Sequence, residues 1–422
     1  MPRATRQWGP IVGMHLAGAP IVFLAEPELI GEVLLDKEGV FHKDKVTSDL
    51  SSFLGQGLLT AEDELWRKQR KLIAPSLTKK HIASYADTMT RLAEAHASNL
   101  RDGEVRDVHS DMTRLTLDIV VETLFGTALA AGYEKAAELM DALMNDFVEM
   151  VQTWRRLFPS WVPFAARRRT KEHARELDAF VLELIRRKRA SGELGDDLLS
   201  RLLEARDDEG SGMSDRQLRD EALTLFAAGH ETTANALTYA LMLLGEHPEI
   251  DARLQTELGS ALGDRKATAA DVSKLPLTDA VIKESLRLYP PAYMIGREAT
   301  REVRIGAWEL PPRTTVLMSI WGMHHDPRFF PDPEAFRPDR WLDGSTTSLP
   351  KYVYQPFGGG PRVCVGNHFA MMEAVLTLAA LLRRARWELV SRTPPELQMA
   401  ITMRPVHGLP MRVRLRGAGR SF

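Results

Sequence analysis

The chain has 422 residues, of which 44% are hydrophobic and 27% are charged, and its formal net charge is −2. This balance is typical of a globular protein, and it excludes a long disordered tail and a strongly basic nucleic-acid-binding surface. The chain has 1 cysteine, Cys364, which excludes an intrachain disulfide and suits a cytoplasmic protein.

The N-terminal region predicts two short strands and no membrane anchor. Its most apolar stretch, residues 11–30, is interrupted by glycines, prolines, a histidine and glutamates. A membrane-spanning helix needs about 20 predominantly apolar residues, so this stretch is too broken to span. We expect strands at Ile11–Leu16 and Pro20–Leu24, followed by a helix from about Pro27.

Helical periodicity dominates the next part of the chain. Trp66 and Arg70 are four residues apart and therefore share one face of a helix, whereas Arg67, Lys68 and Lys71 face elsewhere. By itself this basic stretch is typical of a solvated helix end. A cluster of aromatic residues farther along is typical of core packing and consists of Trp154, Phe158, Trp161 and Phe164.

A long helix is predicted from about Asp215. Ser214 and Gln217 form a capping box at its start, and His247-Pro248 ends the pattern. Some thirty residues at about 1.5 Å each span on the order of 45 Å. Such a helix would cross an entire domain.

The middle of this helix contains the sequence Ala-Gly-His-Glu-Thr-Thr, residues 228–233. Glycine and threonine are poor helix formers, each costing up to about 1 kcal/mol relative to alanine, and threonine hydroxyls can bend a helix. The segment is therefore either a packing kink or a functional site. It is not the zinc motif H-E-x-x-H, because residue 234 is alanine.

Farther along, Glu284 and Arg287 lie three residues apart on a helix that Pro290-Pro291 ends. Such a pair is ordinarily a surface ion pair worth a few tenths of a kcal/mol. Strands are expected after it at 303–305, 308–310 and 314–320, with Pro311-Pro312 as a turn.

Cys364 follows three glycines and precedes an apolar, helical run from Phe369 to Leu382. A lone cysteine is most often an inert buried residue. Here the glycines allow close approach of the backbone, and the sulfur would lie near a helix N-terminus, where a thiolate is favoured. Arg362 adds positive charge two residues away. These surroundings indicate an anionic sulfur, which acts as a metal ligand or a nucleophile.

Four motifs together resemble those of the cytochrome P450 family. They are W-x-x-x-R at 66–70, A-G-x-E-T-T at 228–233, E-x-x-R at 284–287 and F-x-x-G-x-R-x-C-x-G at 357–366. The resemblance implies one haem-thiolate catalytic domain over residues 1–422, mainly α with a smaller β region, whose long central helix lies over the haem. The family's helix upstream of the first strand is expected to be short or missing here.

The resemblance also implies the cofactor and its ligands. The cofactor would be haem b (iron protoporphyrin IX), with Cys364 as the thiolate axial ligand of the iron. An arginine fork matches a carboxylate, so the haem propionates would be anchored by four residues, Trp66, Arg70, Arg297 and Arg362. Further contacts with the haem would come from Phe357, Gly358, Gly366 and Ala228.

The remaining implied roles concern protons, substrate and scaffold. Thr232 and Glu231 would deliver the two protons that reductive O–O cleavage consumes. Glu284, Arg287 and Arg340 would form a buried structural network. An apolar substrate pocket would be lined by Ala228, Ala292, Met294, Ile295 and Ile401.

The implied activity is monooxygenation with O2, two electrons and two protons. It would hydroxylate or epoxidise an apolar small molecule such as a terpenoid, fatty acid, steroid or carotenoid. Length and cysteine content leave no room for a flavin or iron–sulfur domain, so a separate ferredoxin or flavodoxin with its reductase would supply electrons. Arg67, Lys68 and Lys71 are hypothesised to face that acidic partner. We expect a cytoplasmic monomer without a membrane anchor that does not bind nucleic acid.

Two alternatives stay open. The chain could be a family relative that uses peroxide or rearranges its substrate without external electrons, or a non-catalytic haem-thiolate sensor or binding protein. Neither needs proton delivery, so the presence of both Glu231 and Thr232 favours the monooxygenase.

Overall fold

The computed structural model describes residues 9–16, 18–126, 133–152, 164–192 and 194–417. The chain divides into two compact units. Unit 1 comprises Met1–His42, Lys79–Thr116 and Glu231–Phe422, and unit 2 comprises Lys43–Thr78 and Leu117–His230. The fold is mainly helical with a smaller β region, as the sequence predicts. Three of the four clustered aromatic residues, Trp154, Phe158 and Trp161, lie outside the described residues.

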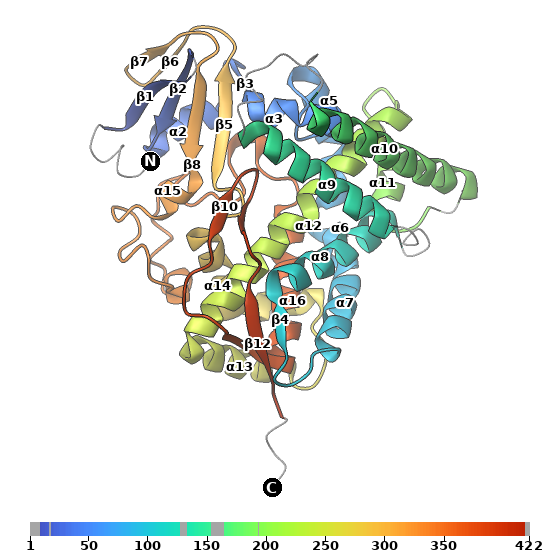
Figure 1. The fold of residues 1–422 in the computed structure, drawn as a ribbon, viewed down its shortest axis with the longest axis vertical. Helices are drawn as coiled ribbons and strands as arrows, with labels where there is room; N and C mark the ends of the chain where they lie inside the picture. Colours follow the sequence, from blue (N-terminus) through green and yellow to red (C-terminus); the bar gives the residue numbers. More distant parts are fainter. Residues whose placement is uncertain (1–8, 17, 127–132, 153–163, 193, 418–422) are drawn as a thin grey trace. The chain divides into compact units, whose positions relative to one another are not determined.

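The largest sheet belongs to the β region of unit 1 and has the strand order β1-β2-β8-β5-β3. Strands β2 and β8 are parallel, whereas β1 with β2 and β5 with β8 are antiparallel. Helix α2 (Pro27–Leu35) lies against this sheet (Figure 1) and buries Ile30 and Val33 among Val22, Val316 and Met318. The strands are β1 (Ile11–Leu16), β2 (Ala19–Leu24), β3 (Phe41–Lys43), β5 (Met294–Ala299) and β8 (Thr315–Ser319).

Three smaller sheets complete the β region. They are the hairpin β6 (Val303–Ile305) with β7 (Trp308–Leu310), the three-stranded sheet β4 (Val105–Asp107), β12 (Pro410–Leu415) and β9 (Ala385–Leu389), and the hairpin β10 (Leu397–Met399) with β11 (Met403–Pro405). The predicted strands at the N-terminus and at 303–320 are confirmed to within a residue. Strand β5 and the C-terminal strands were not predicted, although β12 alternates the buried Met411 and Val413 with arginines.

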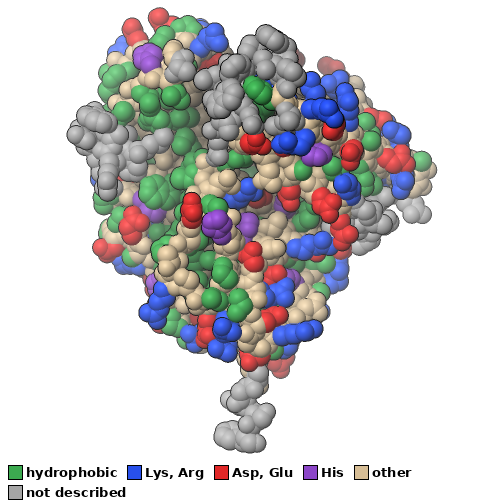
Figure 2. All heavy atoms as spheres, viewed as in Figure 1, with side chains coloured by type: hydrophobic (Ala, Val, Ile, Leu, Met, Phe, Trp, Pro, Cys, Tyr) green, Lys and Arg blue, Asp and Glu red, His purple; other side chains and the backbone are tan. Residues whose placement is uncertain are grey.

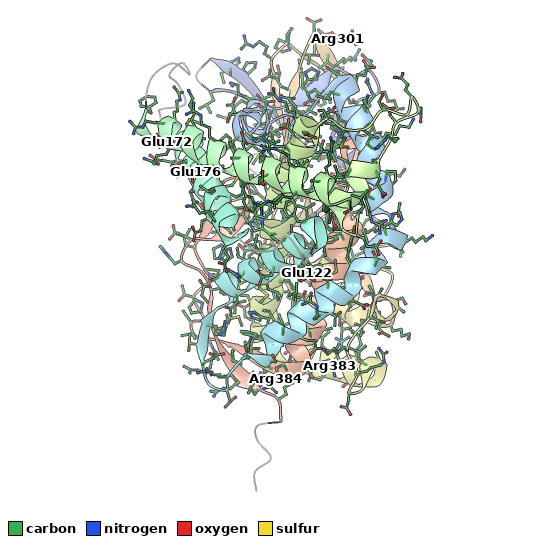
Figure 3. The ribbon with its side chains drawn as sticks, turned by 90° about the vertical axis from the view of Figure 1, so that its right-hand side faces the viewer. Glu122, Glu172, Glu176, Arg301, Arg383 and Arg384 are labelled. Atoms are coloured by element: carbon green, nitrogen blue, oxygen red, sulfur yellow. The ribbon has the colours of Figure 1, made fainter. Side chains whose placement is uncertain are left out.

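In unit 1, helix α16 packs against α7, α13 and α14. Arg383 and Arg384 end α16 (Figure 3), and Arg383 donates to the carbonyls of Gly263 and Arg265 at 3.1 and 2.8 Å. Cations are favourable at a helix C-terminus. The helices are α6 (Lys79–Ile82), α7 (Ala86–Ser98), α13 (Pro248–Leu262), α14 (Pro276–Leu288), α15 (Ile320–His324) and α16 (Asn367–Arg384), with 3-10 turns at Ala83–Tyr85, Ala269–Lys274, Pro338–Trp341 and Gly360–Arg362.

Unit 2 is helical. Helix α10 packs along α9, and Phe53 meets Phe147 edge-to-face with ring centroids 5.8 Å apart. Its helices are α3 (Lys45–Asp49), α4 (Ser51–Leu54), α5 (Asp63–Ile73), α9 (Tyr133–Gln152), α10 (Ala165–Ser191) and α11 (Leu198–Glu204), with a 3-10 turn at Ala74–Leu77. Helices α8 (Val108–Phe125) and α12 (Asp215–Glu246) each contribute residues to both units.

Helix α12 confirms the predicted long helix. It has 32 residues and runs without interruption through 228–233. The capping box is present: the Ser214 N–H donates to Gln217 Oε1 at 2.9 Å, and the Gln217 N–H donates to Ser214 Oγ at 3.3 Å. Gly229 serves close packing, since a Cβ there would lie 3.1 Å from Val120 Cγ2.

The surface is mixed in charge. On the face shown in Figure 2, Lys and Arg side chains lie among Asp and Glu side chains, as the net charge of −2 leads one to expect. Within the described ranges, none of the helices combines the length and the apolar character required to cross a bilayer.

Candidate active site

The loop that carries Cys364 is held closed by its own backbone. The Cys364 N–H donates to the Phe357 carbonyl at 2.9 Å, and the Gly358 N–H donates to the Gln355 carbonyl at 2.9 Å. Helix α16 begins at Asn367 with Gly366 as its N-cap residue, so the sulfur lies three residues before the helix. The cysteine is exposed, not a buried core residue.

The glycines of this loop allow it to pack on unit 1. Gly358 and Gly360 have φ angles of +72° and +67°, which side chains rarely adopt. A Cβ on Gly360 would overlap the Leu34 carbonyl at the end of α2. A Cβ on Gly359 would lie 2.6 Å from the ring of Tyr352. Helix α2 and Tyr352 therefore fix the position of the cysteine loop.

Strand β5 brings two further predicted residues to the loop. A Cβ on Gly358 would lie 3.3 Å from Ile295 Cδ1, so Ile295 contacts the loop. Arg297 is two residues farther along β5 and therefore on the same face of the strand. Its guanidinium is buried and donates to the Gly296 carbonyl at 2.8 Å. A buried cation on that face suits a carboxylate partner.

The candidate pocket residues Ala292 and Ile401 lie in two segments that hydrogen bonds join. On one side of Ala292, the Pro291 carbonyl accepts from the Met403 N–H at 2.9 Å. On its other side, the Tyr293 hydroxyl donates to the Ala400 carbonyl at 2.8 Å. Ala292 is exposed, and Met294 and Ile295 follow it at the start of β5. Four of the five predicted pocket residues thus belong to connected segments of unit 1.

Glu231 is held by residues from the end of the chain. Its Oε1 accepts from Thr402 Oγ1 at 2.8 Å and lies 3.4 Å from Arg404 Nη1. Sequence reasoning named Ile401 as a pocket residue but did not link Arg404 to Glu231. Some 170 residues separate the partners, and no local pattern links them.

One turn beyond Glu231, Asn235 is fully buried and contacts His109, which sequence reasoning missed. His109 Nε2 lies 3.1 Å from Asn235 Oδ1, so the ring donates to the amide oxygen. Burial lowers the pKa of His109 below its ordinary value. Asp107 and Glu231 raise it, whereas the positive charge of Arg404 lowers it further. The pKa of His109 therefore depends on the charges of Glu231 and Arg404.

Three predicted haem contacts, Trp66, Arg70 and Ala228, lie in unit 2. Trp66 and Arg70 are half-buried on one face of α5, as predicted, and Ala228 is exposed on α12. Lys68 and Lys71 pair with Asp207 and Asp208 at the surface, and that they face an acidic partner stays a prediction.

Glu284, Arg287 and Arg340 form one buried hydrogen-bonded network. Glu284 Oε1 accepts from Arg287 at 2.9 Å and from Arg340 at 3.0 Å. Its Oε2 accepts from Arg287 at 3.0 Å and from the Trp341 indole at 2.9 Å. Every hydrogen-bonding direction of the carboxylate is thus used, which is what burying such charges requires.

His324 connects this network to the cysteine loop. The Gln355 N–H donates to His324 Nε2 at 3.0 Å, so Nδ1 carries the proton and donates to the Arg287 carbonyl at 3.2 Å. Burial lowers the pKa of His324 to about 3, and the ring is therefore neutral. Gln355 in turn accepts from Gly358, which ties the network to residues 355–364.

These residues fit a metal-bound porphyrin better than a metal ion alone. No group of three or more His, Cys, Asp or Glu residues suited to holding a metal ion occurs in the described part of the chain. An exposed thiol at a helix N-terminus, set in a loop that glycines bring close to α2, can supply one axial ligand. The buried Arg297 beside the loop can balance a carboxylate.

Comparisons with known proteins agree. The family model described as Cytochrome P450 matches residues 1–409. Cyclooctatin synthase of Streptomyces melanosporofaciens is 36% identical over 95% of this chain and 88% of its own. Cyclooctat-9-en-7-ol 5-monooxygenase of the same organism is 33% identical over 90% of this chain and 83% of its own. Among solved structures, retinoic acid bound cyanobacterial CYP120A1 aligns with a TM-score of 0.86 at 26% identity, covering 98% of this chain and 93% of that one.

Proposed function

This chain belongs to the cytochrome P450 family and is a haem b-dependent monooxygenase, and we propose that it hydroxylates or epoxidises a terpenoid. The relatives named for cyclooctatin and cyclooctat-9-en-7-ol support a terpenoid-like substrate over a fatty acid, steroid or carotenoid. The apolar side chains of Ala292, Met294, Ile295 and Ile401 suit such a substrate.

The haem, when bound, supplies the redox chemistry that activates O2. Cys364 would be its axial thiolate ligand, with Phe357, Gly358 and Gly366 shaping the loop around it. Arg297, Arg362, Trp66 and Arg70 would neutralise or bind the propionates, and Ala228 would face the ring. The closed turn at Cys364 and the start of α16 favour an anionic sulfur.

Glu231 and Thr232 would manage the protons. Glu231 and Thr232 are consecutive residues of α12, in a segment that includes the exposed Ala228. Thr232 would donate to the reacting oxygen, and Glu231 would pass it protons from solvent. The observation that carries the proposal is this consecutive acid and alcohol on α12 in a chain that also presents an exposed cysteine.

As a member of this family, the protein receives electrons from a redox partner and uses O2 and a small-molecule substrate. We propose that the donor is a separate ferredoxin or flavodoxin with its reductase. We further propose that residues 1–422 form one catalytic domain and that the protein is a cytoplasmic monomer.

Reconstitution with a surrogate ferredoxin and reductase tests the function. Terpenoids are first screened for a substrate-induced spin-state shift of the haem band, and each binder is then supplied with NADPH and isotopically labelled O2. We expect substrate-dependent NADPH consumption and one labelled oxygen atom in the product. Product formed only with added peroxide would support the peroxide-using alternative, and binding without any product would support the sensor.

A further inference from the structure

The β10–β11 hairpin holds one oxygen of the Glu231 carboxylate. Thr402 lies in the turn between the two strands and donates to Oε1 at 2.8 Å. Arg404 lies on β11 and places Nη1 3.4 Å from the same oxygen. The Glu231 and Arg404 side chains are 16% and 28% exposed, so the pair is less screened by solvent than an exposed one. Both contacts involve Oε1, which leaves Oε2 outside the pair.

Arg404 is itself positioned by the hairpin. Its Nε donates at 2.9 Å to the side-chain oxygen of Gln398, which lies directly across from it in the β10–β11 register. The guanidinium therefore uses one edge for Gln398 and another for Glu231.

The hairpin is anchored to the rest of unit 1 on both sides. The Met403 N–H donates to Pro291, and the Met403 carbonyl accepts from the Tyr239 hydroxyl at 3.3 Å. Tyr293 binds the carbonyl of Ala400. Because Tyr239 lies two turns beyond Glu231 on α12, the hairpin and the helix are fastened at two points. Thr402 and Arg404 thus hold Glu231 from a fixed frame.

We propose that Thr402 and Arg404 are positioning residues for proton delivery, which hold Glu231 by Oε1 so that Oε2 exchanges protons with Thr232. This inference rests on the proposed monooxygenase function and extends it to two residues outside the helix motif. Loss of either contact leaves the carboxylate free to turn toward solvent. Reducing equivalents then leave as hydrogen peroxide instead of entering product.

The test compares Thr402→Val and Arg404→Gln with wild-type holoenzyme. Each variant is expected to raise the share of NADPH that ends as hydrogen peroxide about threefold or more, while substrate affinity from the spin-state shift stays within twofold. Thr402→Ser and Arg404→Lys keep the donor and the charge and should restore coupling. Arg414→Gln is the matched control, because Arg414 pairs with Glu388 at 2.9 Å on other strands.

A second measurement does not depend on turnover. The imidazole of His109 is titrated by NMR and assigned with His109→Asn; it is surrounded by Asp107, Asn235, Arg404 and Glu231. Removing the cation in Arg404→Gln should raise the pKa of His109, and removing the anion in Glu231→Gln should lower it. Arg414→Gln should leave it unchanged. If the pKa of His109 is the same in Arg404→Gln as in the wild type, the Arg404–Glu231 pair is absent in solution. That result would overturn the proposal.

The two proposals fail in distinguishable ways. A wild-type protein that forms no product with any bound terpenoid overturns the proposed function together with this inference. A wild-type protein that forms product, with unchanged peroxide shares in Thr402→Val and Arg404→Gln, overturns the positioning role alone.

Discussion

Cys364 shows how one residue depends on its immediate backbone. The closed turn from Phe357 and the start of α16 favour a charged sulfur. Replacing Cys364 with His keeps a possible nitrogen ligand but removes the thiolate. We expect complete loss of the strongly red-shifted Soret band of the reduced carbonyl complex, measured by difference spectroscopy. Survival of that band would exclude thiolate ligation by Cys364.

The hydroxyl of Thr232 is the group on which the proposed proton delivery depends. Thr232→Ala removes the hydroxyl but keeps the haem, so product formation should fall on the order of tenfold or more while peroxide rises. Product and peroxide are measured per NADPH consumed. Thr238→Ala is the control, because Thr238 Oγ1 only donates to the Ala234 carbonyl at 2.7 Å within the same helix. Equal coupling in the two variants would contradict the proton role.

Glu221 is a buried acid on α12 that sequence reasoning missed. The Leu58 N–H donates to its Oε2 at 3.0 Å, and burial raises the pKa of Glu221 from 4.5 to about 8. The folded state therefore holds the proton more tightly than the unfolded state does. Its stabilising contribution is complete below pH 4.5 and is lost as the pH rises to about 8.

Glu221→Gln tests this assignment. Relative to the variant, the wild type should lose about 1 kcal/mol of unfolding free energy per pH unit across that interval. Denaturant unfolding at several pH values measures the difference. A constant difference between the two proteins would show that Glu221 does not titrate there.

At the scale of elements, the contact between α2 and the cysteine loop depends on Gly360. Gly360→Ala places a Cβ against the Leu34 carbonyl at a φ of +67°. We expect the free energy of unfolding to fall by about 3 kcal/mol or more, and the haem content to be lower. Gly344→Ala is the control, since Gly344 has a φ of +82° but open space around it. In that variant the free energy of unfolding should fall by only about 1 kcal/mol, and the haem should be retained.

The elements that could be predicted are those whose pattern lies within a short stretch of the sequence. The capping box and His247-Pro248 located α12, and alternation with turn residues located β1, β2, β6 and β7. Strands β10 and β11 have only three residues each. Strand β12 alternates Met411, Val413 and Leu415 with arginines, a signal that sequence reasoning missed, and its partner β4 lies far away in the sequence. The same reason explains the site: Cys364 and Glu231 stand in spaced motifs, whereas Thr402, Arg404 and His109 become functional candidates only through contacts with α12.

At the scale of the whole molecule, the Glu284 network joins α14, residues 337–341 and, through His324, the cysteine loop. Glu284→Gln leaves two buried guanidinium groups without their anion. We expect a loss of about 3–5 kcal/mol in unfolding free energy and weaker haem retention. Glu388→Gln removes an exposed ion pair and should change stability by less than about 1 kcal/mol. Similar losses in the two variants would mean that the network is not a buried scaffold.

The order of residues at the hairpin turn has a consequence for changing this enzyme. Ile401, a candidate pocket residue, is bonded directly to Thr402, which holds Glu231. A substitution that enlarges the pocket at 401 therefore alters the packing next to Thr402. Substitutions at this position that admit bulkier substrates are therefore expected to raise the share of NADPH that ends as hydrogen peroxide. Second-site changes that recover efficiency are expected to cluster at Gln398 and Arg404.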